Sequence, residues 1–202
     1  MAILVTGGAR SGKSSFAEQL ASRLGDRGIY VATSRVWDDE MSDRVSKHKA
    51  DRVTSDFQWE TIEEPLELAQ KLYEIAVNVG NGVQQGQRPP VVLVDCLTLW
   101  LTNWLMIGEE KLDGQSDRNI SEWLMEPIDQ LESSIMDYPY PLVIVTNEVG
   151  DGIVPAYSLG RKFRDEAGRL NQRIAARCDR VFLVTAGIPI ELKSQVFQWE
   201  NL

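Results

Sequence analysis

The sequence predicts an α/β protein in which helices cover both faces of a mostly parallel central sheet. Two observations carry this prediction. Short apolar runs suited to buried strands recur along the chain, over 2–5, 29–33, 91–94, 142–146 and 180–185. Longer segments with apolar residues at helical spacing separate most of these runs, and strands that alternate with helices pair in parallel. With 202 residues, 43% of them hydrophobic, one domain spanning residues 1–202 is expected.

The strongest local signal is the turn after the first apolar run, GGARSGKS over residues 7–14. The spacing G-x-x-x-x-G-K-S between a strand and a helix is that of a phosphate-binding loop (P-loop), in which backbone N–H groups and the helix N-terminus point at one anion. The expected fold is therefore a P-loop NTPase-type three-layer fold. The whole loop is the candidate nucleotide site: Gly7, Gly8, Ala9, Arg10, Ser11, Gly12, Lys13 and Ser14.

Two side chains of this loop have expected roles in the chemistry. Lys13 is expected to face solvent in the empty loop and to reach the β- and γ-phosphates of a nucleotide. The Ser14 hydroxyl is expected to hold Mg²⁺.

Composition and charge limit the function classes. The net charge of −9 disfavours a nucleic-acid binder, because a polyanion would meet net repulsion unless the basic residues were strongly segregated. No apolar run approaches the roughly 20 residues of a membrane span, and the P-loop begins too early to leave room for a signal or transit peptide. A cytoplasmic protein is therefore expected. Cys96 and Cys178 lack metal-ligand spacing and are interpreted as buried thiols.

Polar side chains stand at the ends of two further predicted strands, where open α/β sheets bind ligands. Thr33 and Ser34 end the second run and are either ligand contacts or ordinary turn residues. Asp95 follows the run 91–94, a pattern typical of a strand that delivers a carboxylate to the Mg²⁺ of a bound nucleotide. Downstream of a P-loop, we interpret Asp95 as a metal ligand together with Ser14.

The segment 38–49 opens with acidic residues and closes with basic ones, which favours a helix. It contains His48, the only histidine of the chain. From the residues alone, two interpretations of His48 stay open: part of an anion site, or the end of an apolar helix stripe with solvated neighbours, which the spacing favours. The neighbours that make an anion site conceivable are basic: Arg44, Lys47, Lys49 and Arg52.

A short strand is expected over 57–60, followed by a helix whose start is marked by a capping box of Thr61 and Glu64. Glu63 then lies in the first turn of that helix, where a carboxylate is usually a dipole partner but near a nucleotide can also accept ribose hydroxyls. Residues 80–90, rich in Gly, Gln and Pro, are expected to form a surface loop.

Further helices are expected over 121–136 and 158–177, and the stretch 108–119 is expected to be a polar excursion. Trp100 and Trp104 are interpreted as core or interface residues rather than as base-stacking platforms. Three arginines share one face of the last helix and are interpreted as a solvated ridge: Arg169, Arg173 and Arg177.

Two features are expected near the end of the sheet. Asn147 and Glu148 follow a strand and are either ligand contacts or part of a connecting loop. The run 180–185 is expected to close the sheet as its last core strand.

Taken together, these segments resemble one family, the bifunctional adenosylcobinamide kinase and adenosylcobinamide-phosphate guanylyltransferase of cobalamin (vitamin B12) biosynthesis. The resemblance covers nearly the whole chain. It is carried by residues 3–14, 32–34, 38–41 with Arg44 and His48-Lys49, 59–61, 145–150, 152–155, 163–165, 167–169 and 171–173.

The resemblance implies that His48 is the nucleophile that takes GMP from GTP as a phosphoramidate, which reverses the preference from spacing. It implies phosphorylation of adenosylcobinamide with ATP or GTP, then transfer of GMP to adenosylcobinamide phosphate, with Mg²⁺ required. It also implies a homotrimer, with exposed tryptophan and leucine around 100–106 as interface. Besides the P-loop, the implied nucleotide contacts are Ala32, Thr33, Ser34, Lys49, Ala50, Asp51, Arg52, Glu63 and Asp95.

Two positions depart from the family pattern. Val53 stands where family members often have proline, and Asp95 stands where some have glutamate. Two other functions stay open on sequence alone: a monofunctional P-loop kinase of another small alcohol, in which His48 is structural, and a nucleotide-gated binding or assembly protein.

Overall fold

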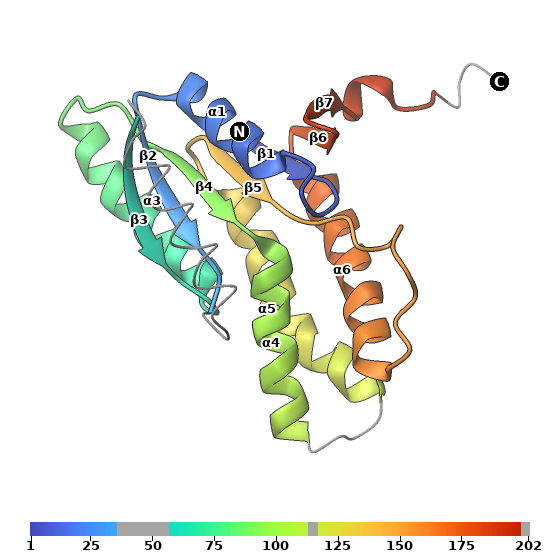
Figure 1. Cartoon of the computed structure of the whole chain (residues 1–202). Coiled ribbons are helices and arrows are strands. Elements are labelled where there is room, and N and C mark those ends of the chain that lie inside the picture. The colour runs from blue at the N-terminus through green and yellow to red at the C-terminus, as the bar shows by residue number, and fades with distance from the viewer. Residues whose placement is uncertain (36–56, 113–116, 199–202) are drawn as a thin grey trace.

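The computed structural model describes residues 1–35, 57–112 and 117–198. The helix expected over 38–49, and with it His48 and Lys49 to Arg52, lies outside these residues. The elements follow in the order β1 (Ala2–Thr6), α1 (Lys13–Leu24), β2 (Arg27–Ala32), β3 (Gln58–Glu63), α3 (Leu68–Gln84), β4 (Val91–Asp95), α4 (Leu97–Leu112), α5 (Asp117–Asp137), β5 (Leu142–Val145), α6 (Ser158–Arg177), β6 (Arg180–Thr185), β7 (Ile188–Glu191) and the 3₁₀ helix η1 (Lys193–Gln195) (Figure 1).

The strands form one seven-stranded sheet in the order β3-β2-β4-β5-β1-β6-β7. Neighbouring strands from β3 to β6 are parallel, and β7 pairs antiparallel with β6. The predicted mostly parallel sheet is therefore confirmed. Because β1 lies between β5 and β6, the P-loop leaves the sheet in its interior rather than at an edge.

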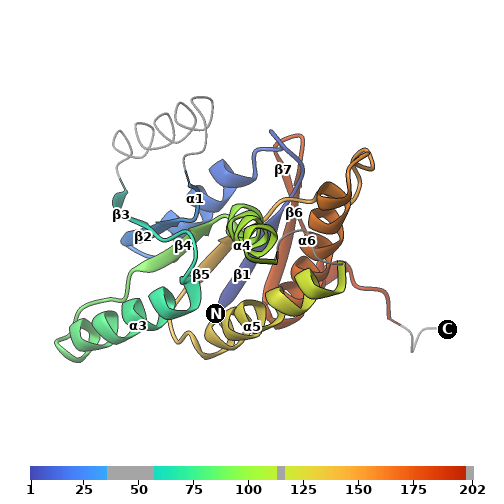
Figure 2. The same ribbon diagram turned by 90° about the horizontal axis from the view of Figure 1, so that it is seen from below.

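Helices cover both faces of this sheet, as Figure 2 shows for α1 on one side and for α3 and α5 on the other. The alternation of strand side chains explains the layers, because successive residues point to opposite faces. Ile3 and Val5 pack in a cluster with Ala17 and Ala21 of α1. Leu4 belongs to the larger cluster that joins the sheet to α3, α4, α5 and α6. None of the described helices is long and apolar enough to cross a membrane.

The prediction that Thr61 and Glu64 form a helix capping box is wrong. Thr61 pairs with β2 as a strand residue, and Glu63 is the last residue of β3. Glu64 still helps the chain to enter α3, since its Oε1 accepts hydrogen bonds from the backbone N–H of Leu66 at 3.1 Å and of Glu67 at 2.8 Å. Pairing with a neighbouring strand therefore outweighs a local helix signal.

Two helices extend further than expected. Helix α3 runs through Gly80 and Gly82 to Gln84, so only the end of the expected 80–90 loop is irregular. Helix α4 continues to Leu112 into the expected polar excursion, because Gly108 lies against α5. A Cβ at Gly108 would come within 2.7 Å of the Trp123 ring, so glycine here permits close helix packing.

The last predicted core strand does not close the sheet. After β6, Ala186 and Gly187 adopt positive φ angles of 51° and 77° and reverse the chain. Strand β7 then adds to the edge of the sheet beyond β6. A two-residue turn with positive φ at both positions matches the twist of an antiparallel hairpin.

The arginine ridge of α6 is not simply solvated. Glu132 of α5, only 8% exposed, accepts hydrogen bonds from Nε of Arg177 at 2.5 Å and from Nε of Arg173 at 2.8 Å. These two hydrogen bonds hold the pKa of Glu132 below its ordinary value. Arg169 pairs with Glu166 of its own helix at 2.6 Å. The ridge therefore joins α5 to α6 through a carboxylate that is largely withdrawn from water.

The tryptophans of α4 belong to the core. Trp100 is 1% exposed, and its indole N–H donates to the Leu66 carbonyl oxygen at 2.8 Å. The half-buried Trp104 donates to the same oxygen at 3.2 Å. Among the large hydrophobic residues of 100–106, only Met106 is exposed. The surplus of exposed tryptophan and leucine expected there is therefore absent from this described helix.

Candidate nucleotide site

The P-loop joins β1 to α1, and its motif glycines have distinct structural reasons. At Gly7, a Cβ would lie 2.4 Å from the Val184 carbonyl oxygen, so any side chain would collide with the backbone of β6. Gly12 has a φ of 92°, which L side chains rarely adopt, and a Cβ there would approach Gly187 Cα to 3.2 Å. The first glycine is thus required by close packing and the second by backbone conformation.

Backbone hydrogen bonds hold the loop from three directions. Within the loop, Ser11 N–H donates to Gly8 O at 3.3 Å. Gly187 of the β6–β7 turn donates to Ser11 O at 2.8 Å. Glu148, just after β5, donates its backbone N–H to Gly7 O at 3.1 Å. The loop is therefore preorganised by segments that are distant in the sequence.

The expectation that Lys13 faces solvent is wrong, because the residue is only 9% exposed. Its Nζ donates to the Gly8 carbonyl oxygen at 3.1 Å, so the side chain folds back over its own loop. An ammonium group withdrawn from water needs an oxygen partner, which this carbonyl supplies. The cationic group is thereby held beside the loop that the sequence assigns to phosphate.

Two hydroxyls at the loop have unused hydrogen-bonding capacity. Thr6 Oγ1 and Ser11 Oγ are buried and have no hydrogen-bond partner within the described part of the chain. Buried hydroxyls without a partner are uncommon in native proteins and call for an explanation. Their position at a P-loop fits a site that completes its hydrogen bonding around a bound anion.

Asp95 is the last residue of β4, and the Tyr30 hydroxyl donates to its Oδ2 at 2.9 Å. In the sheet register Asp95 stands opposite Val145, which stands opposite Val5 at the end of β1. Two strand spacings, roughly 10 Å, therefore separate the backbone of Asp95 from that of Val5. The carboxylate therefore lies at the same end of the sheet as the P-loop, the end at which the parallel strands finish.

The oxygen ligands available at this end of the sheet fit Mg²⁺. Ser14 in the first turn of α1 offers a hydroxyl, and Asp95 offers a carboxylate, both of them oxygen ligands of the type that Mg²⁺ prefers. Across the described ranges, no three His, Cys, Asp or Glu side chains gather as a metal site. Mg²⁺ commonly takes one or two protein oxygens and completes its coordination with nucleotide phosphates and water.

Other predicted nucleotide contacts also lie at the carboxyl-terminal ends of the strands. Glu63 and Asp95 flank Ala32 in register, so β2, β3 and β4 bring these residues together at the carboxyl-terminal end of the strands. Thr33 is fully buried, and its hydroxyl donates to Cys96 O at 2.6 Å while accepting the Cys96 N–H at 2.8 Å. The Thr33 hydroxyl therefore ties the end of β2 to the end of β4. Its neighbour Ser34 is half-buried.

A polar network beside β5 was not predicted from the sequence. Thr146 donates to Asn171 Oδ1 at 2.7 Å, and Asn171 donates through Nδ2 to Asn147 O at 3.0 Å. Thr98 Oγ1 accepts the Asn147 N–H at 2.8 Å. The network fixes the turn whose next residue, Glu148, contacts the P-loop. No spacing rule joins residues on α4, after β5 and on α6, so only the fold reveals this network.

Both cysteines are buried and unpaired, as expected. Burial, reinforced by the charge of Asp95, raises the pKa of the Cys96 thiol to about 12. Burial also raises the pKa of Cys178 to about 12. Thiols that stay protonated at neutral pH are poor nucleophiles, so neither cysteine is a candidate catalytic residue.

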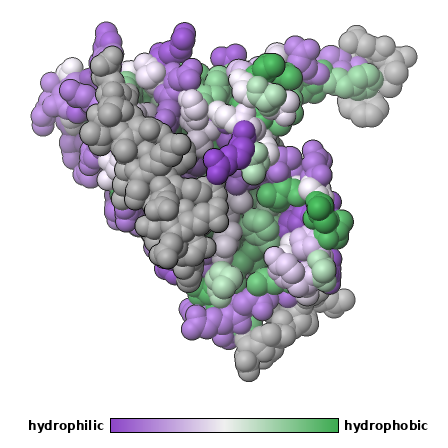
Figure 3. All heavy atoms as spheres, viewed as in Figure 1, coloured by the Kyte–Doolittle hydropathy of each residue, from purple (hydrophilic) through white to green (hydrophobic). Residues whose placement is uncertain are grey.

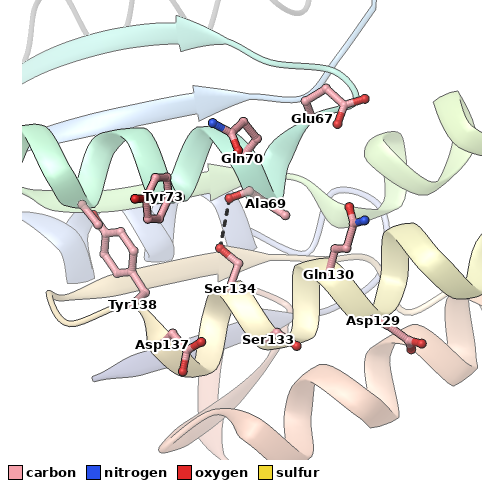
Figure 4. A pocket seen from close by; sticks show the side chains of 11 residues that line it. Glu67, Ala69, Gln70, Tyr73, Asp129, Gln130, Ser133, Ser134, Asp137 and Tyr138 are labelled. Carbon is pink, nitrogen blue, oxygen red and sulfur yellow. Dashed lines mark hydrogen bonds between the residues drawn. The ribbon is translucent and has the colours of Figure 1, made fainter.

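A groove of about 710 Å³ lies away from the P-loop, between α3 and α5 (Figure 4). Ser134 of α5 spans it to donate to the Ala69 carbonyl oxygen at 3.1 Å. Its lining contains three carboxylates and no basic residue, which does not suit the phosphates of a nucleotide. The polar residues that line it are Glu67, Gln70, Tyr73, Asp129, Gln130, Ser133, Ser134, Asp137 and Tyr138.

Comparison with known proteins finds relatives over nearly the whole chain. Residues 3–192 match the model of the family described as cobinamide kinase / cobinamide phosphate guanyltransferase. The chain is 41% identical over 193 residues to the bifunctional adenosylcobalamin biosynthesis protein CobP of Pseudomonas aeruginosa, covering 95% of this chain and 97% of that protein. It is 39% identical over 203 residues to the bifunctional protein CobU of Escherichia coli, covering 96% of this chain and 100% of that one.

The fold is also similar to two solved ATPases of bacterial type III secretion systems, one of them EscN of enteropathogenic E. coli. Their TM-scores are 0.52 and 0.54, at 12% and 11% sequence identity. Nearly all of this chain is matched, 100% and 99%, but it spans only 60% and 50% of those longer chains. At such low identity the likeness concerns the fold alone, and it confirms the P-loop NTPase-type architecture.

Proposed function

The chain belongs to the cobinamide kinase / cobinamide phosphate guanyltransferase family, and from this premise we propose that it catalyses two successive reactions of cobalamin biosynthesis. It phosphorylates adenosylcobinamide with ATP or GTP. It then transfers GMP from GTP to adenosylcobinamide phosphate, which yields adenosylcobinamide-GDP. The observation that carries the proposal is the preorganised P-loop, with Lys13 Nζ held 3.1 Å from the Gly8 carbonyl oxygen.

In the kinase reaction, the hydroxyl oxygen of adenosylcobinamide attacks the γ-phosphorus. The bond to the β–γ bridging oxygen breaks, the nucleoside diphosphate leaves, and the hydroxyl proton is released. Backbone N–H groups of the P-loop, the N-terminus of α1 and the Lys13 ammonium stabilise the charge of the transferring phosphoryl group. Ser14 and Asp95 would hold Mg²⁺, which would supply further neutralisation of phosphate oxygens.

In the transferase reaction, a neutral ring nitrogen of His48 attacks the α-phosphorus of GTP, and pyrophosphate leaves. The product is a phosphoramidate between His48 and GMP. A phosphate oxygen of adenosylcobinamide phosphate then attacks the same phosphorus, the P–N bond breaks, and neutral His48 returns. We assign the remaining nucleotide contacts to Ala32, Thr33, Ser34, Lys49, Ala50, Asp51, Arg52 and Glu63.

We further propose a cytoplasmic homotrimer. Support comes from the chain after the β6–β7 turn, where large apolar side chains are exposed at the edge of the sheet. Ile188, Ile190 and Val196 are 62%, 47% and 56% exposed. Apolar side chains gathered at one edge are typical of an interface between protein chains. A molar mass of one subunit by light scattering would contradict the trimer.

The two-step function predicts a defined order of products. With Mg²⁺, adenosylcobinamide and ATP alone, mass spectrometry should detect adenosylcobinamide phosphate and nothing further. Addition of GTP should convert it to adenosylcobinamide-GDP with release of pyrophosphate. A reaction that stops at the phosphate in the presence of GTP would favour a monofunctional kinase. If neither product forms although nucleotide binds, a nucleotide-gated binding protein is favoured instead.

The Asp95→Asn variant tests the metal site. The substitution removes one negative charge from the oxygen donor set, so the Mg²⁺ concentration that gives half-maximal kinase rate should rise about tenfold. Asp26→Asn is the matched control, because Asp26 is an exposed carboxylate beside Arg88 at the amino end of β2. If the Mg²⁺ titration of Asp95→Asn coincides with that of the control, another residue holds the metal.

A further inference from the structure

The segment between β5 and α6 exposes large apolar side chains. Ile153, Val154 and Tyr157 are 96%, 58% and 68% exposed. Hydrophobic residues gather over this segment in the space-filling view (Figure 3). A contiguous exposed apolar patch usually marks a binding surface, whereas single exposed apolar residues need no explanation. We refer to Ile153, Val154 and Tyr157 as the apolar patch.

The backbone that carries the apolar patch is held in place. Arg161 donates through one guanidinium nitrogen to the carbonyl oxygens of Pro155 at 3.1 Å and Ala156 at 2.6 Å. Arg164 donates through Nε at 3.1 Å and through a terminal nitrogen at 2.5 Å to Gly150 O. A loop pinned at both ends loses less conformational entropy when a ligand covers it.

The apolar patch begins close to the nucleotide site. Strand β5 lies directly beside β1 in the sheet. Immediately after β5, Glu148 donates its N–H to Gly7 O of the P-loop at 3.1 Å. The chain leads from this contact into the patch within a few residues. A ligand on the patch would thus lie at the same end of the sheet as the phosphate to be transferred, where the parallel strands finish.

Charged groups of both signs lie around the patch. Asp151 is exposed two residues before it, and Glu148 lies further upstream. Arg161 and Arg164 keep their positive charge while they donate to backbone carbonyl oxygens, and Lys162 pairs with Glu109 at 3.3 Å. The apolar side chains, rather than a surplus of one charge, therefore distinguish this surface.

On the basis of the proposed function, we propose that the apolar patch holds the corrin ring of adenosylcobinamide while the hydroxyl arm enters the P-loop site. A corrin ring is a broad macrocycle edged with methyl groups, which match the exposed apolar side chains of the patch. The reacting hydroxyl stands on a flexible arm, so the ring must be held beside the phosphate site for the arm to reach it.

The Val154→Ser/Tyr157→Ala variant tests this surface. Its matched control is Val77→Ser/Tyr73→Ala on α3, because Val77 and Tyr73 are similarly exposed, 47% and 64%. Loss of two apolar contacts should raise KM for adenosylcobinamide in the kinase assay about tenfold or more. KM for ATP and kcat should change less than about twofold, since neither residue belongs to the P-loop.

Three further measurements make the outcome decisive. Equilibrium dialysis, read by the visible absorbance of adenosylcobinamide, should show the same loss of affinity without turnover. Unchanged dialysis and unchanged KM in an active, folded variant would overturn the proposal. A changed molar mass by light scattering would overturn it in favour of a second copy of the chain on the patch. If the unmodified protein neither binds nor phosphorylates adenosylcobinamide, the proposed function itself fails.

Discussion

Replacing His48 with alanine should abolish covalent labelling of the protein by GTP. Incubated with Mg²⁺ and GTP labelled at the α-phosphate, the unmodified protein should keep label through denaturation as histidine-linked GMP. The His48→Ala variant should keep none, because the chain has only one histidine and no other imidazole can replace it. Guanylyltransferase turnover should fall with the label, while kinase activity, which depends on the P-loop, should persist at least in part.

The chemistry of the label provides the control. A phosphoramidate is stable in base and is lost in mild acid, whereas a phosphoester on serine or threonine survives the acid. Label at the γ-phosphate should not stay on the protein, because it leaves with pyrophosphate. Acid-labile GMP on the His48→Ala protein, or none on the unmodified protein, would refute the covalent mechanism and return His48 to the end of an apolar helix stripe.

The Lys13→Ala variant should lose kinase activity with little loss of fold. Removal of one preorganised cationic donor from a transferring phosphoryl group should lower kcat by about 10²–10³-fold. In the structure the charged Lys13 ammonium donates to the Gly8 carbonyl oxygen, and loss of such a hydrogen bond costs about 1.5–3 kcal/mol. Kinase turnover should therefore fall strongly, while the melting temperature should change little.

Lys71→Ala is a suitable comparison, since Lys71 of α3 likewise binds a nearby oxygen, Oε2 of Glu74, at 2.6 Å. It should leave kinase turnover near that of the unmodified protein. Near-normal turnover in Lys13→Ala would show that the P-loop is not the kinase site. A melting temperature that falls far more in Lys13→Ala than in Lys71→Ala would point to a structural role of Lys13.

The sequence predicted best those features that short segments determine. The P-loop needs only its glycines, lysine and serine between a strand and a helix, and that context was legible in residues 2–24. The position of Asp95 could be predicted because it ends an apolar strand, and ligands of a parallel sheet bind at the carboxyl-terminal ends of its strands. In both cases one local pattern fixes the position of a functional group.

Features that depend on distant partners were missed. Thr61 and Glu64 match a helix start, yet β2 recruits the segment as a strand. Gly108 suggests a break until the Trp123 ring is seen against it. The Thr98 and Thr146 hydroxyls are hydrogen-bonded to each other, and Thr146 donates to Asn171 Oδ1, so these bonds join α4, the end of β5 and α6 across long sequence separations. Tertiary packing decides each of these cases, and no short window of sequence contains it.

The hydrogen bond from Gly187 to Ser11 thermodynamically links the last hairpin of the sheet to the first loop of the chain. A nucleotide that binds the folded loop stabilises the native state by mass action, and local opening of the β6–β7 turn must break a contact of that same loop. The Gly187 amide therefore acts as a reporter of occupancy. The rate of hydrogen exchange of this amide should fall as nucleotide occupies the P-loop, although nearly the whole sequence separates Gly187 from that loop.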